Sequence, residues 1–504
     1  MKRKLITYFL FFIAQIAIAQ KEDYNWIMGT GLTEPDSNYK LNFINFLNDS
    51  FEVDLLYHSN PFFGTESIIS DTAGNLLCYT NGINIYNRSH AIMQNGQNFQ
   101  SSSQYPYGYP LNQAVLILPF PDSSNLYIMI DEIYIDIGID IVINNLRYSL
   151  IDLNLSNQMG AITLKKISFA SISDTLNIGN LTSVRHGNGR DWWVLVTKYE
   201  SSIFRKYLIS NYGIENKGEQ DIGETVPNGV GYSTHSPDGN WYARYNTYGN
   251  TSNLKAVIHF YRFDRCTGLL SDPHYKFYPG TEVYGGVAFS PNSRFLYVSK
   301  YTKVFQYDLE SPDILASEKV VAEYDGFLDE NGVPTRFYGL QLAPDNKIYG
   351  NIPGFNSRYL HVIDQPNLPG DSCNVVQHAI YLPAHNFGTL PNLPFYRLYE
   401  EEGSPCDTLA TTTKWVTPAA IPNIRVWPVP AADVLYFSAQ GDWSEPLDLD
   451  LYDALGRLAL SLDALQVAPY AQIDLGMLPP GAYFFALRRQ DGTRVKTGKV
   501  VRTK

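Results

Sequence analysis

A strand–turn–strand unit that recurs along the chain is the strongest constraint on its fold. Each clear copy combines a short apolar strand, a Ser/Ala-Pro-Asp/Asn turn and a second strand rich in tyrosine. The clear copies are YSTHSPDGNWYARYN (232–246), VAFSPNSRFLYVSKY (287–301) and LQLAPDNKIYGNIP (340–353). Proline presets φ in such turns, and Asp or Asn bonds to its own backbone, so the turn chemistry supports a tight connection. Self-similarity of this kind is typical of a repeat architecture.

Weaker copies extend the repeat toward the N-terminus, over residues 70–87, 117–132 and 184–199. The turns are centred near residues 74, 123, 189, 239, 293 and 346, and the later spacings are 50–54 residues. That length accommodates a four-stranded antiparallel sheet with its connections, which is one blade of a β-propeller.

Six turns and three N-terminal strands predict seven blades. The N-terminal strands are WIMGTGL (26–32), YKLNFINF (39–46) and FEVDLLY (51–57). We therefore expect an all-β chain with a seven-bladed propeller, in which the N-terminal strands close the ring with strands near residues 375–400. A set of separate β-sandwiches is the alternative, because sandwiches also turn about every 8–12 residues.

The composition agrees with strands and excludes several other classes. The chain has 37 Tyr and is 14% aromatic but only 17% charged, which disfavours helical bundles, coiled coils and disordered chains. Its net charge of −12 argues against general nucleic-acid binding, which needs a basic surface. After the first residues, no stretch is long and apolar enough to predict a transmembrane helix.

The first residues match an export signal. Residues 2–4 are all basic, residues 5–18 are mostly apolar, and Ala17 and Ala19 supply the small side chains that a signal peptidase needs before Gln20. The apolar stretch is shorter than the roughly twenty residues of a membrane-spanning helix. We therefore expect a cleaved signal peptide rather than an uncleaved membrane anchor.

A break in composition near residue 410 divides the rest of the chain. Asn occurs 37 times up to Asn392 and once afterwards, and the segment TLATTTKWVTPAAIP is rich in Thr, Ala and Pro, as linkers are. We expect four parts: a signal peptide (1–19), a β-propeller (20–407), a linker (408–422) and a small immunoglobulin-like β-sandwich (423–504).

The repeat region resembles a propeller family common in exported proteins of Gram-negative gliding and surface-colonising bacteria. The resemblance rests on GNLLCYTNGINIYN (74–87), HFYRFDRCTGLLSDP (259–273), AFSPNSRFLYVS (288–299), YGLQLAPDNKIYG (338–350) and FGTLPNLPF (387–395). These are turn and strand motifs, so the resemblance implies a fold and no reaction.

The order of motifs in residues 423–504 resembles the type A C-terminal sorting domain of type IX secretion cargo. The family's Tyr-Pro-Asn-Pro-like, Tyr-Asp-x-x-Gly-Arg and Leu-Pro-x-Gly-x-Tyr elements correspond to 427–430, 452–457 and 478–483 here. The first element differs, with Trp427 for Tyr and Val429 for Asn. An ordinary adhesion module is the alternative. The resemblance assigns the sorting signal to Pro428, Pro430, Gly456, Arg457, Pro479, Gly481 and Tyr483.

This resemblance implies a route out of the cell. A signal peptidase would release the chain into the periplasm, and the type IX translocon and sorting machinery would carry it across the outer membrane. The protein would then be secreted or attached at the cell surface.

Motifs for catalysis are missing from the sequence. Its nine histidines show no HExxH or similar metal spacing, and there is no nucleophile elbow, P-loop or Rossmann fingerprint, so we expect no metal and no cofactor. Asp131, Glu132, Asp136 and Asp140 could ligate Ca²⁺, but we interpret them as the wet face of a strand.

Four cysteines, at positions 78, 266, 373 and 406, permit three disulfide pairings in an exported chain. Because Cys373 and Cys406 flank the closing region, we expect a bridge between them that fastens the end of the ring. Free buried thiols are the alternative.

Candidate ligand residues stand near the repeated inner strands, where propellers bind ligands at the mouth of the central channel. They are Arg185, His186, Tyr232, His235, Tyr284, Arg336 and Tyr338. Aromatic rings suit sugar faces or peptide side chains, although Tyr and His there could also simply pack between blades.

Two functions remain open from the sequence. The first is a non-enzymatic binding protein for a glycan or peptide, such as an adhesin. The second is a secreted hydrolase, which needs two acids roughly 5–10 Å apart in the channel mouth. A mouth lined by Tyr, Asn and backbone favours the binding protein, whereas two facing acids favour the hydrolase.

Deletion of residues 423–504 is expected to leave the protein in the periplasm of its native host, because the sorting signal lies in that segment. Cell fractionation with surface labelling checks this. Normal surface delivery of the truncated chain would contradict the sorting assignment.

Overall fold

A computed structural model describes the fold of most of the chain. The described residues are 20–30, 40–47, 51–57, 61–170, 175–249, 253–280, 283–354, 357–401, 403–406, 424–439, 446–454, 457–467, 470–489 and 494–503. The chain forms two compact units, residues 1–409 and 410–504, and each is described by itself. The predicted signal peptide and the predicted linker lie outside the described residues.

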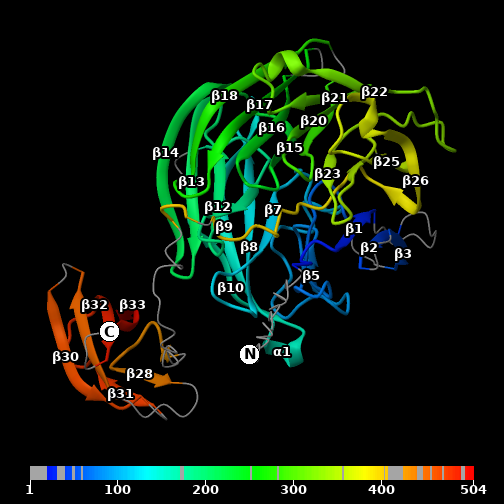
Figure 1. The fold of residues 1–504 in the computed structure, drawn as a ribbon. Coiled ribbons are helices and arrows are strands. Elements are labelled where there is room, and N and C mark those ends of the chain that lie inside the picture. The colour runs from blue at the N-terminus through cyan, green and yellow to red at the C-terminus, as the bar shows by residue number, and fades with distance from the viewer. Residues whose placement is uncertain are drawn as a thin grey trace, which may run out of the picture. The chain divides into compact units, whose positions relative to one another are not determined.

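Seven antiparallel sheets follow one another along the described part of the first unit, and each occupies a consecutive stretch of sequence (Figure 1). The first two sheets have three strands: β1 (Asn25–Gly29), β2 (Leu41–Asn45) and β3 (Glu52–Leu56), then β4 (Ser67–Ser70), β5 (Leu76–Thr80) and β6 (Ile85–Asn87).

The other five sheets have four strands each. The third contains β7 (Val115–Pro119), β8 (Leu126–Asp136), β9 (Ile141–Asp152) and β10 (Ala161–Ser168), with the short helix α1 (Leu155–Gln158). The fourth contains β11 (Thr182–Arg185), β12 (Trp192–Thr197), β13 (Ser201–Ser210) and β14 (Gly213–Val226). The fifth contains β15 (Val230–His235), β16 (Trp241–Tyr248), β17 (Lys255–Asp264) and β18 (Leu269–Tyr278). The sixth contains β19 (Gly285–Phe289), β20 (Phe295–Lys300), β21 (Lys303–Asp308) and β22 (Lys319–Glu323). The seventh contains β23 (Leu340–Leu342), β24 (Ile348–Gly350), β25 (Ser357–Ile363) and β26 (Val375–Asn386).

These sheets are the blades of a seven-bladed β-propeller, as the repeat predicts. Each of the six predicted turns connects the first and second strands of one blade. The three clear copies share one device: the side-chain oxygen of Asp238, Asn292 or Asp345 accepts a hydrogen bond from the backbone N–H two residues later, at 3.0–3.2 Å. This local bond reverses the chain without help from other blades, which is why the turns are visible in the sequence.

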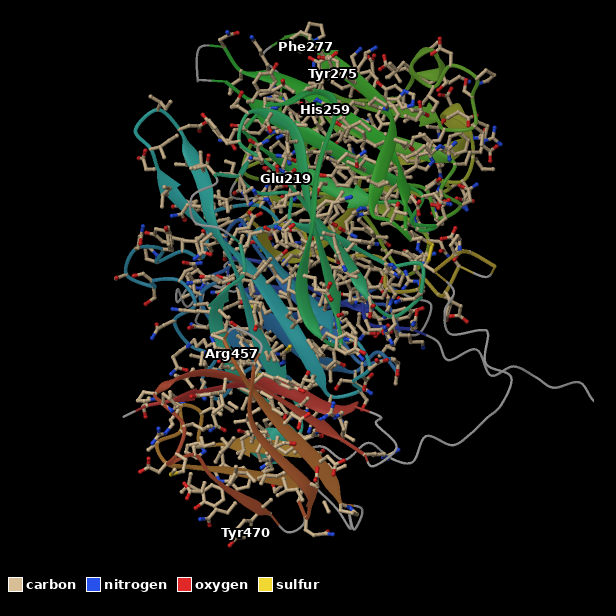
Figure 2. The ribbon with its side chains drawn as sticks, turned by 90° about the vertical axis from the view of Figure 1, so that its left-hand side faces the viewer. Glu219, His259, Tyr275, Phe277, Arg457 and Tyr470 are labelled. Carbon is tan, nitrogen blue, oxygen red and sulfur yellow. A yellow bond between two sulfur atoms is a disulfide. The ribbon has the colours of Figure 1, made fainter. Side chains whose placement is uncertain are left out.

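The outermost strands face solvent and carry isolated aromatic rings. On β18, Tyr275 and Phe277 are exposed, and the Tyr275 ring packs 5.1 Å from the buried ring of His259 on β17 (Figure 2). The core instead lies between the blades, where the apolar faces of neighbouring sheets pack on each other.

The first and last blades meet at the seam of the ring. The Asn42 side chain donates to the Ala384 carbonyl at 3.0 Å and accepts from the Ala384 N–H at 2.9 Å. The N-terminal strands therefore lie beside residues 375–386, as expected, but they form their own sheet and do not share one with β26. The residues after β26 follow a different path.

Residues 387–398, which we call the axial segment, run along the centre of the ring. Asn392 donates to Val115 O and Leu181 O at 2.9 and 2.8 Å, and its N–H donates to Glu66 O at 2.8 Å. The buried Tyr396 hydroxyl donates to Ile117 O at 3.1 Å. Figure 1 shows this segment as the yellow trace that crosses the ring from the side of β23 toward β12. The centre of the ring is thus filled by the chain itself.

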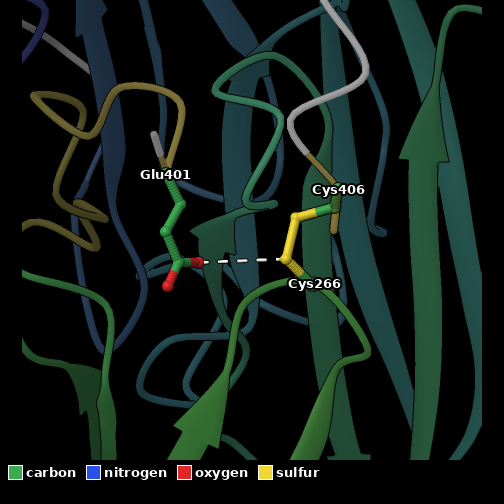
Figure 3. A group of neighbouring side chains, drawn as sticks. All are labelled: Cys266, Glu401 and Cys406. Carbon is green, nitrogen blue, oxygen red and sulfur yellow. Dashed lines mark hydrogen bonds between the residues drawn. A yellow bond between two sulfur atoms is a disulfide. The ribbon is translucent and has the colours of Figure 1, made fainter. Parts of the chain in front are cut away.

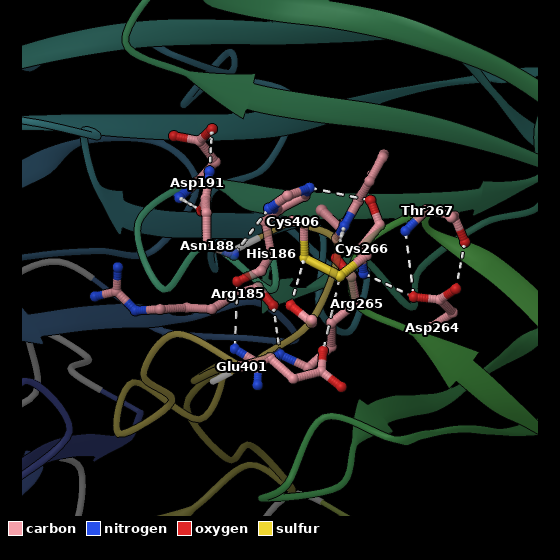
Figure 4. Close-up of a disulfide and its surroundings, with 12 residues drawn as sticks. Arg185, His186, Asn188, Asp191, Asp264, Arg265, Cys266, Thr267, Glu401 and Cys406 are labelled. Atoms are coloured by element: carbon pink, nitrogen blue, oxygen red, sulfur yellow. Dashed lines mark hydrogen bonds between the residues drawn. A yellow bond between two sulfur atoms is a disulfide. The ribbon is translucent and has the colours of Figure 1, made fainter. Parts of the chain in front are cut away.

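The expected disulfide between Cys373 and Cys406 is wrong in one of its two cysteines. Cys406 bonds to Cys266, in the turn between β17 and β18, while Cys373 and Cys78 are buried free thiols. The axial segment is the reason, because it carries the chain across the ring, away from Cys373. Cys406 therefore emerges beside the fifth blade (Figure 4). The bridge still fastens the end of the propeller.

The second unit contains two facing sheets, in the order β27-β28-β31 and β30-β29-β32-β33. Their strands are β27 (Ile424–Trp427), β28 (Val434–Ala439), β29 (Leu447–Asp453), β30 (Leu458–Leu465), β31 (Ala471–Asp474), β32 (Gly481–Arg488) and β33 (Arg494–Arg502). Leu435, Leu449 and Leu487 lie in the shared core and are fully buried. This is the predicted immunoglobulin-like sandwich. Within the described residues, no helix has the length and apolar character of a membrane span.

Substitution Asn392→Ala is expected to lower the free energy of unfolding by about 2–4 kcal/mol, because it leaves buried carbonyls of the inner strands without a donor. Urea denaturation of the full chain measures the loss. Asn211→Ala is the control, since that exposed side chain donates only at the surface, to Asp122. Equal stability of the two variants would contradict a central role for Asn392.

Candidate functional site

One mouth of the propeller holds a hollow of about 350 Å³, which we call the mouth hollow. It is lined by Phe63, Gly64, Pro110, Asn112, Val230, Tyr284, Tyr301, Tyr338, Pro353, Gly354, Phe387 and Gly388. Two of the seven predicted ligand residues, Tyr284 and Tyr338, are in this lining.

The repeat explains why these residues meet. Val230 opens β15, Tyr284 immediately precedes β19, and Tyr338 stands two residues before β23. Because the first strand of every blade runs along the ring axis in the same direction, residues at these equivalent positions collect at one mouth. The start of the axial segment, Phe387, closes the hollow from the centre.

The tyrosines of the hollow pack against one another. The Tyr284 ring lies 5.9 Å from Tyr338 at an interplanar angle of 90° and 6.0 Å from Tyr301. Tyr232 is buried beneath them, with its ring 5.5 Å from Tyr338. Tyr284 is 44% exposed, so its ring is available to a ligand. The arrangement presents a rigid aromatic surface with hydroxyl groups at its edge.

Hydrogen bonds hold two of these rings in place. The Asn112 amide donates to the Tyr338 hydroxyl at 2.8 Å, and burial raises the pKa of Tyr338, so this hydroxyl stays neutral. The Arg336 guanidinium lies 4.5 Å above the Tyr301 ring and donates to its hydroxyl at 2.5 Å. Arg336 therefore acts behind the hollow and does not line it.

The other three predicted residues lie at the opposite ends of their strands. Arg185 closes β11 and His235 closes β15, and His186 follows Arg185. The space beside His235 measures about 20 Å³ and is lined in part by Leu393 of the axial segment. The structure thus divides the predicted set between two mouths and brings only part of it together.

Arg185 and His186 have structural partners. The Arg185 guanidinium stacks 4.3 Å from the Trp192 ring and donates to Tyr396 O at 3.4 Å. His186 accepts from the Asn188 N–H at 3.0 Å, and its other ring nitrogen lies 3.1 Å from Cys266 O (Figure 4). These contacts fasten the end of the axial segment and the disulfide.

The expectation that the acidic residues of β8 form the solvent-exposed face of a strand is wrong for Asp131 and Glu132. Asp131 and Glu132 are buried, Asp131 in an ion pair with Arg147. Burial raises the pKa of Glu132 to about 8, and its carboxyl oxygen accepts from the Gly179 N–H at 3.2 Å. Arg147 on β9 pairs with Asp131 across the strands, a partner that the local sequence pattern did not reveal.

Asp136 and Asp140 lie at the far end of the same hairpin. Asp136 accepts from the Gly138 N–H at 2.7 Å, and Asp140 accepts from the Asn228 amide at 2.9 Å, so both stabilise loops. Among the described residues, no carboxylate lines the mouth hollow. Glu66 is buried next to the axial segment, and burial raises its pKa well above the ordinary value.

Cys266, Glu401 and Cys406 are the one group in the described part of the chain whose ligand atoms are close enough for a metal. The two sulfurs are already bonded to each other, and a Glu401 carboxylate oxygen lies 3.9 Å from the Cys266 sulfur (Figure 3). Metals in proteins are bound by thiolates and not by a disulfide. The group therefore fastens the end of the propeller.

Sequence reasoning missed all of the hollow's other lining residues. Phe63, Pro110 and Asn112 lie in loops between blades, outside the repeated strand–turn–strand unit. Phe387 opens the non-repeating FGTLPNLPF segment, and that break in the repeat is the signal that could have revealed it.

The predicted sorting residues occupy turns and strand ends of the second unit. The Arg457 side chain, labelled in Figure 2, donates to the Asp453 carboxylate at 2.7 Å across the hairpin. The buried Tyr483, in the strand that Gly481 begins, donates to Pro479 O at 2.7 Å. Pro428 and Pro430 follow β27, and Gly456 lies outside the described residues.

Residues 425–502 match the family "Secretion system C-terminal sorting domain". The second unit is a type IX sorting domain. The sorting domain marks the protein for export to the cell surface or beyond, by the type IX machinery. The expectation drawn from its three motif elements is confirmed.

Comparison with known structures finds matches of low similarity. A Lactobacillus plantarum protein is 11% identical, with a TM-score of 0.43, and the match covers 73% of this chain and 97% of that one. A functionally unknown protein from Desulfotomaculum acetoxidans is 14% identical, with a TM-score of 0.38 and coverages of 73% and 99%. A quinonprotein alcohol dehydrogenase-like protein from Bacteroides thetaiotaomicron is 12% identical, with a TM-score of 0.33 and coverages of 74% and 77%. No curated protein matches the chain in sequence. None of these likenesses bears on the activity of this chain.

Substitution His235→Phe is expected to reduce the rate at which the free energy of unfolding falls as the pH is lowered. Burial lowers the pKa of His235 from 6.5 to about 3, so between these values the unfolded chain binds a proton that the folded chain excludes. Stability therefore falls as the pH drops from 6.5 toward 3, by about 1.4 kcal/mol per pH unit for such a group. Urea denaturation at pH 4, 5, 6 and 7 compares the two slopes. Parallel profiles for wild type and variant would contradict the burial argument.

Proposed function

We propose that the protein is an exported binding protein that holds an uncharged sugar in the mouth hollow. The lining of the hollow carries this proposal, because it combines ring faces with hydroxyl and amide groups and has no charged side chain among the described residues. The sorting domain supports display at the cell surface or secretion. Adhesion to a glycan is the role that fits both.

The chemistry of the lining suits a sugar. The C–H face of a pyranose ring packs on aromatic rings such as Tyr284 and Phe63, while its hydroxyls exchange hydrogen bonds with Tyr hydroxyls and with Asn112. A volume of about 350 Å³ lies within the usual range of ligand pockets, roughly 300–1,000 Å³. A charged ligand would find no counter-charge in this lining.

The hydrolase hypothesis has less support. Hydrolysis of a glycoside needs an acid and a second carboxylate flanking the scissile bond, and the described lining supplies neither. Glu66 is a single buried acid, enclosed beside the axial segment.

The finer steps of export are part of the same proposal. A signal peptidase removes residues 1–19 by cleavage between Ala19 and Gln20. A linker at 408–422 joins the propeller, 20–407, to the sorting domain, 423–504, and the host is a Gram-negative bacterium whose outer membrane the protein crosses. Mass spectrometry of the secreted chain tests these boundaries.

A glycan array probed with the purified full chain tests the function, with a peptide array beside it. Tyr284→Ala is expected to weaken binding to the glycan that the array identifies at least ten-fold, about 1.4 kcal/mol, because it removes the most exposed ring of the hollow. Tyr212→Ala is the matched control, since this tyrosine is 88% exposed and lies outside the hollow.

Two results would contradict the proposal. Binding that is equally strong in wild type and Tyr284→Ala would place the site elsewhere. Retention of peptides and no glycans would assign the hollow to a protein ligand. Thermal melting of both variants shows whether a loss of binding reflects loss of the fold.

A further inference from the structure

A second cavity, of about 460 Å³, lies at the seam between the first and last blades. We call it the seam pocket. It is lined by Tyr24, Phe46, Phe51, Pro344, Asp345, Asn346, Lys347, Tyr349, Val362, Asp364, Val376, Ala379 and Ile380. The first three come from the N-terminal blade and the rest from the last blade, so the pocket exists only when the ring is closed.

The seam pocket and the mouth hollow lie at opposite ends of the same inner strand. Tyr338 precedes β23 and lines the hollow, whereas Asp345 follows β23 and lines the seam pocket. Asp345 is seven positions after Tyr338, which corresponds to about 23 Å of extended chain at roughly 3.3 Å per residue. The two cavities therefore open on opposite faces of the propeller.

Aromatic rings form one wall of the seam pocket. Phe51 stacks on Tyr349 with the ring centroids 5.2 Å apart and an interplanar angle of 19°, and Phe46 packs edge-on against Phe51 at 5.6 Å. Phe46 and Tyr349 are buried, while Phe51 and Tyr24 are partly exposed. The buried rings fix the position of Phe51, which offers its outer surface to the pocket.

Charged groups of both signs form the rim. The Lys347 ammonium lies 2.6 Å from a carboxylate oxygen of Asp364, and this contact raises the pKa of Lys347 and lowers that of Asp364. Asp345 accepts from the Tyr349 hydroxyl at 2.7 Å. The rim thus keeps one ammonium and carboxylate oxygens next to each other.

This combination suits a ligand with several hydroxyl groups. The Lys347 charge is paired with Asp364, so an anion would meet the carboxylates without a free counter-charge. A hydroxyl group can donate to a carboxylate and accept from an ammonium at once, and such charge-assisted hydrogen bonds are strong. The exposed rings add a surface for the C–H face of a sugar.

We infer that the seam pocket is a second carbohydrate-binding site, on the face opposite the mouth hollow. Together with the proposed function of the hollow, on which this part rests, it makes the propeller bivalent. A bivalent propeller of this kind holds two glycan strands at once, one on each face.

Calorimetric titration of the full chain with neutral hexasaccharides tests the inference. The probes are the hexamers of β-1,4-glucose, β-1,3-glucose, β-1,4-mannose, α-1,4-glucose and β-1,4-N-acetylglucosamine. Wild type is expected to bind two equivalents of at least one probe. Lys347→Ala and Phe51→Ala are each expected to weaken one of the two sites at least ten-fold and to leave the other unchanged.

Matched variants separate this inference from the proposed function. Lys303→Ala is the control for Lys347→Ala, because Lys303 forms a similar exposed ion pair, 2.7 Å from Glu323, outside the pocket. Tyr284→Ala removes the hollow's site and is expected to leave the site that Lys347→Ala weakens. Melting curves check that Phe51→Ala, which loses the stack on Tyr349, still folds.

The outcomes are distinct. If Lys347→Ala and Phe51→Ala bind every probe as wild type does, the seam pocket is not a carbohydrate site and the inference is overturned, whatever Tyr284→Ala does. If these two variants lose one site and Tyr284→Ala loses none, the seam pocket is supported and the proposed function of the hollow fails. Binding of no hexasaccharide by wild type overturns both.

Discussion

The hydrogen bonds of Asn392 at the centre of the ring are the interaction on which the rest of the propeller depends. The first strands of the blades converge on the axis, and carbonyls there, such as Val115 O and Leu181 O, need donors that no neighbouring strand supplies. Asn392 provides them while Gln113 donates to its side-chain oxygen at 3.3 Å. In a region away from water, such a satisfied network fixes the positions of the strands that it joins.

Filling the axis also decides where ligands can bind. The axial segment leaves about 20 Å³ beside His235 but about 350 Å³ at the opposite mouth, so the two ends of the same strands have different roles. At one end, Arg185 and His186 hold the end of the axial segment and the Cys266–Cys406 bridge. At the other, the tyrosines that precede the inner strands remain accessible.

Local features of this chain could be predicted, and features that depend on distant contacts could not. The three clear turns were predictable because Asp238, Asn292 and Asp345 bond to their own backbone within two residues. The mouth tyrosines Tyr284 and Tyr338 followed from their place before an inner strand. Most of the remaining lining came from loops without a repeat, and the burial of Asp131 depended on Arg147, which stands on the next strand.

The sequence alone determined the all-β class and the sorting domain and predicted a seven-bladed repeat, because the turns and motifs behind each lie within residues a few positions apart. Tertiary structure alone decided the cysteine pairing, the division of the seven candidate residues between two mouths, and the seam pocket. The physical reason is chain distance: Asn392 and Val115 are 277 residues apart, and Asn42 and Ala384 are 342 apart. Contacts of that span form only when the ring closes, and they set which end of each strand faces solvent.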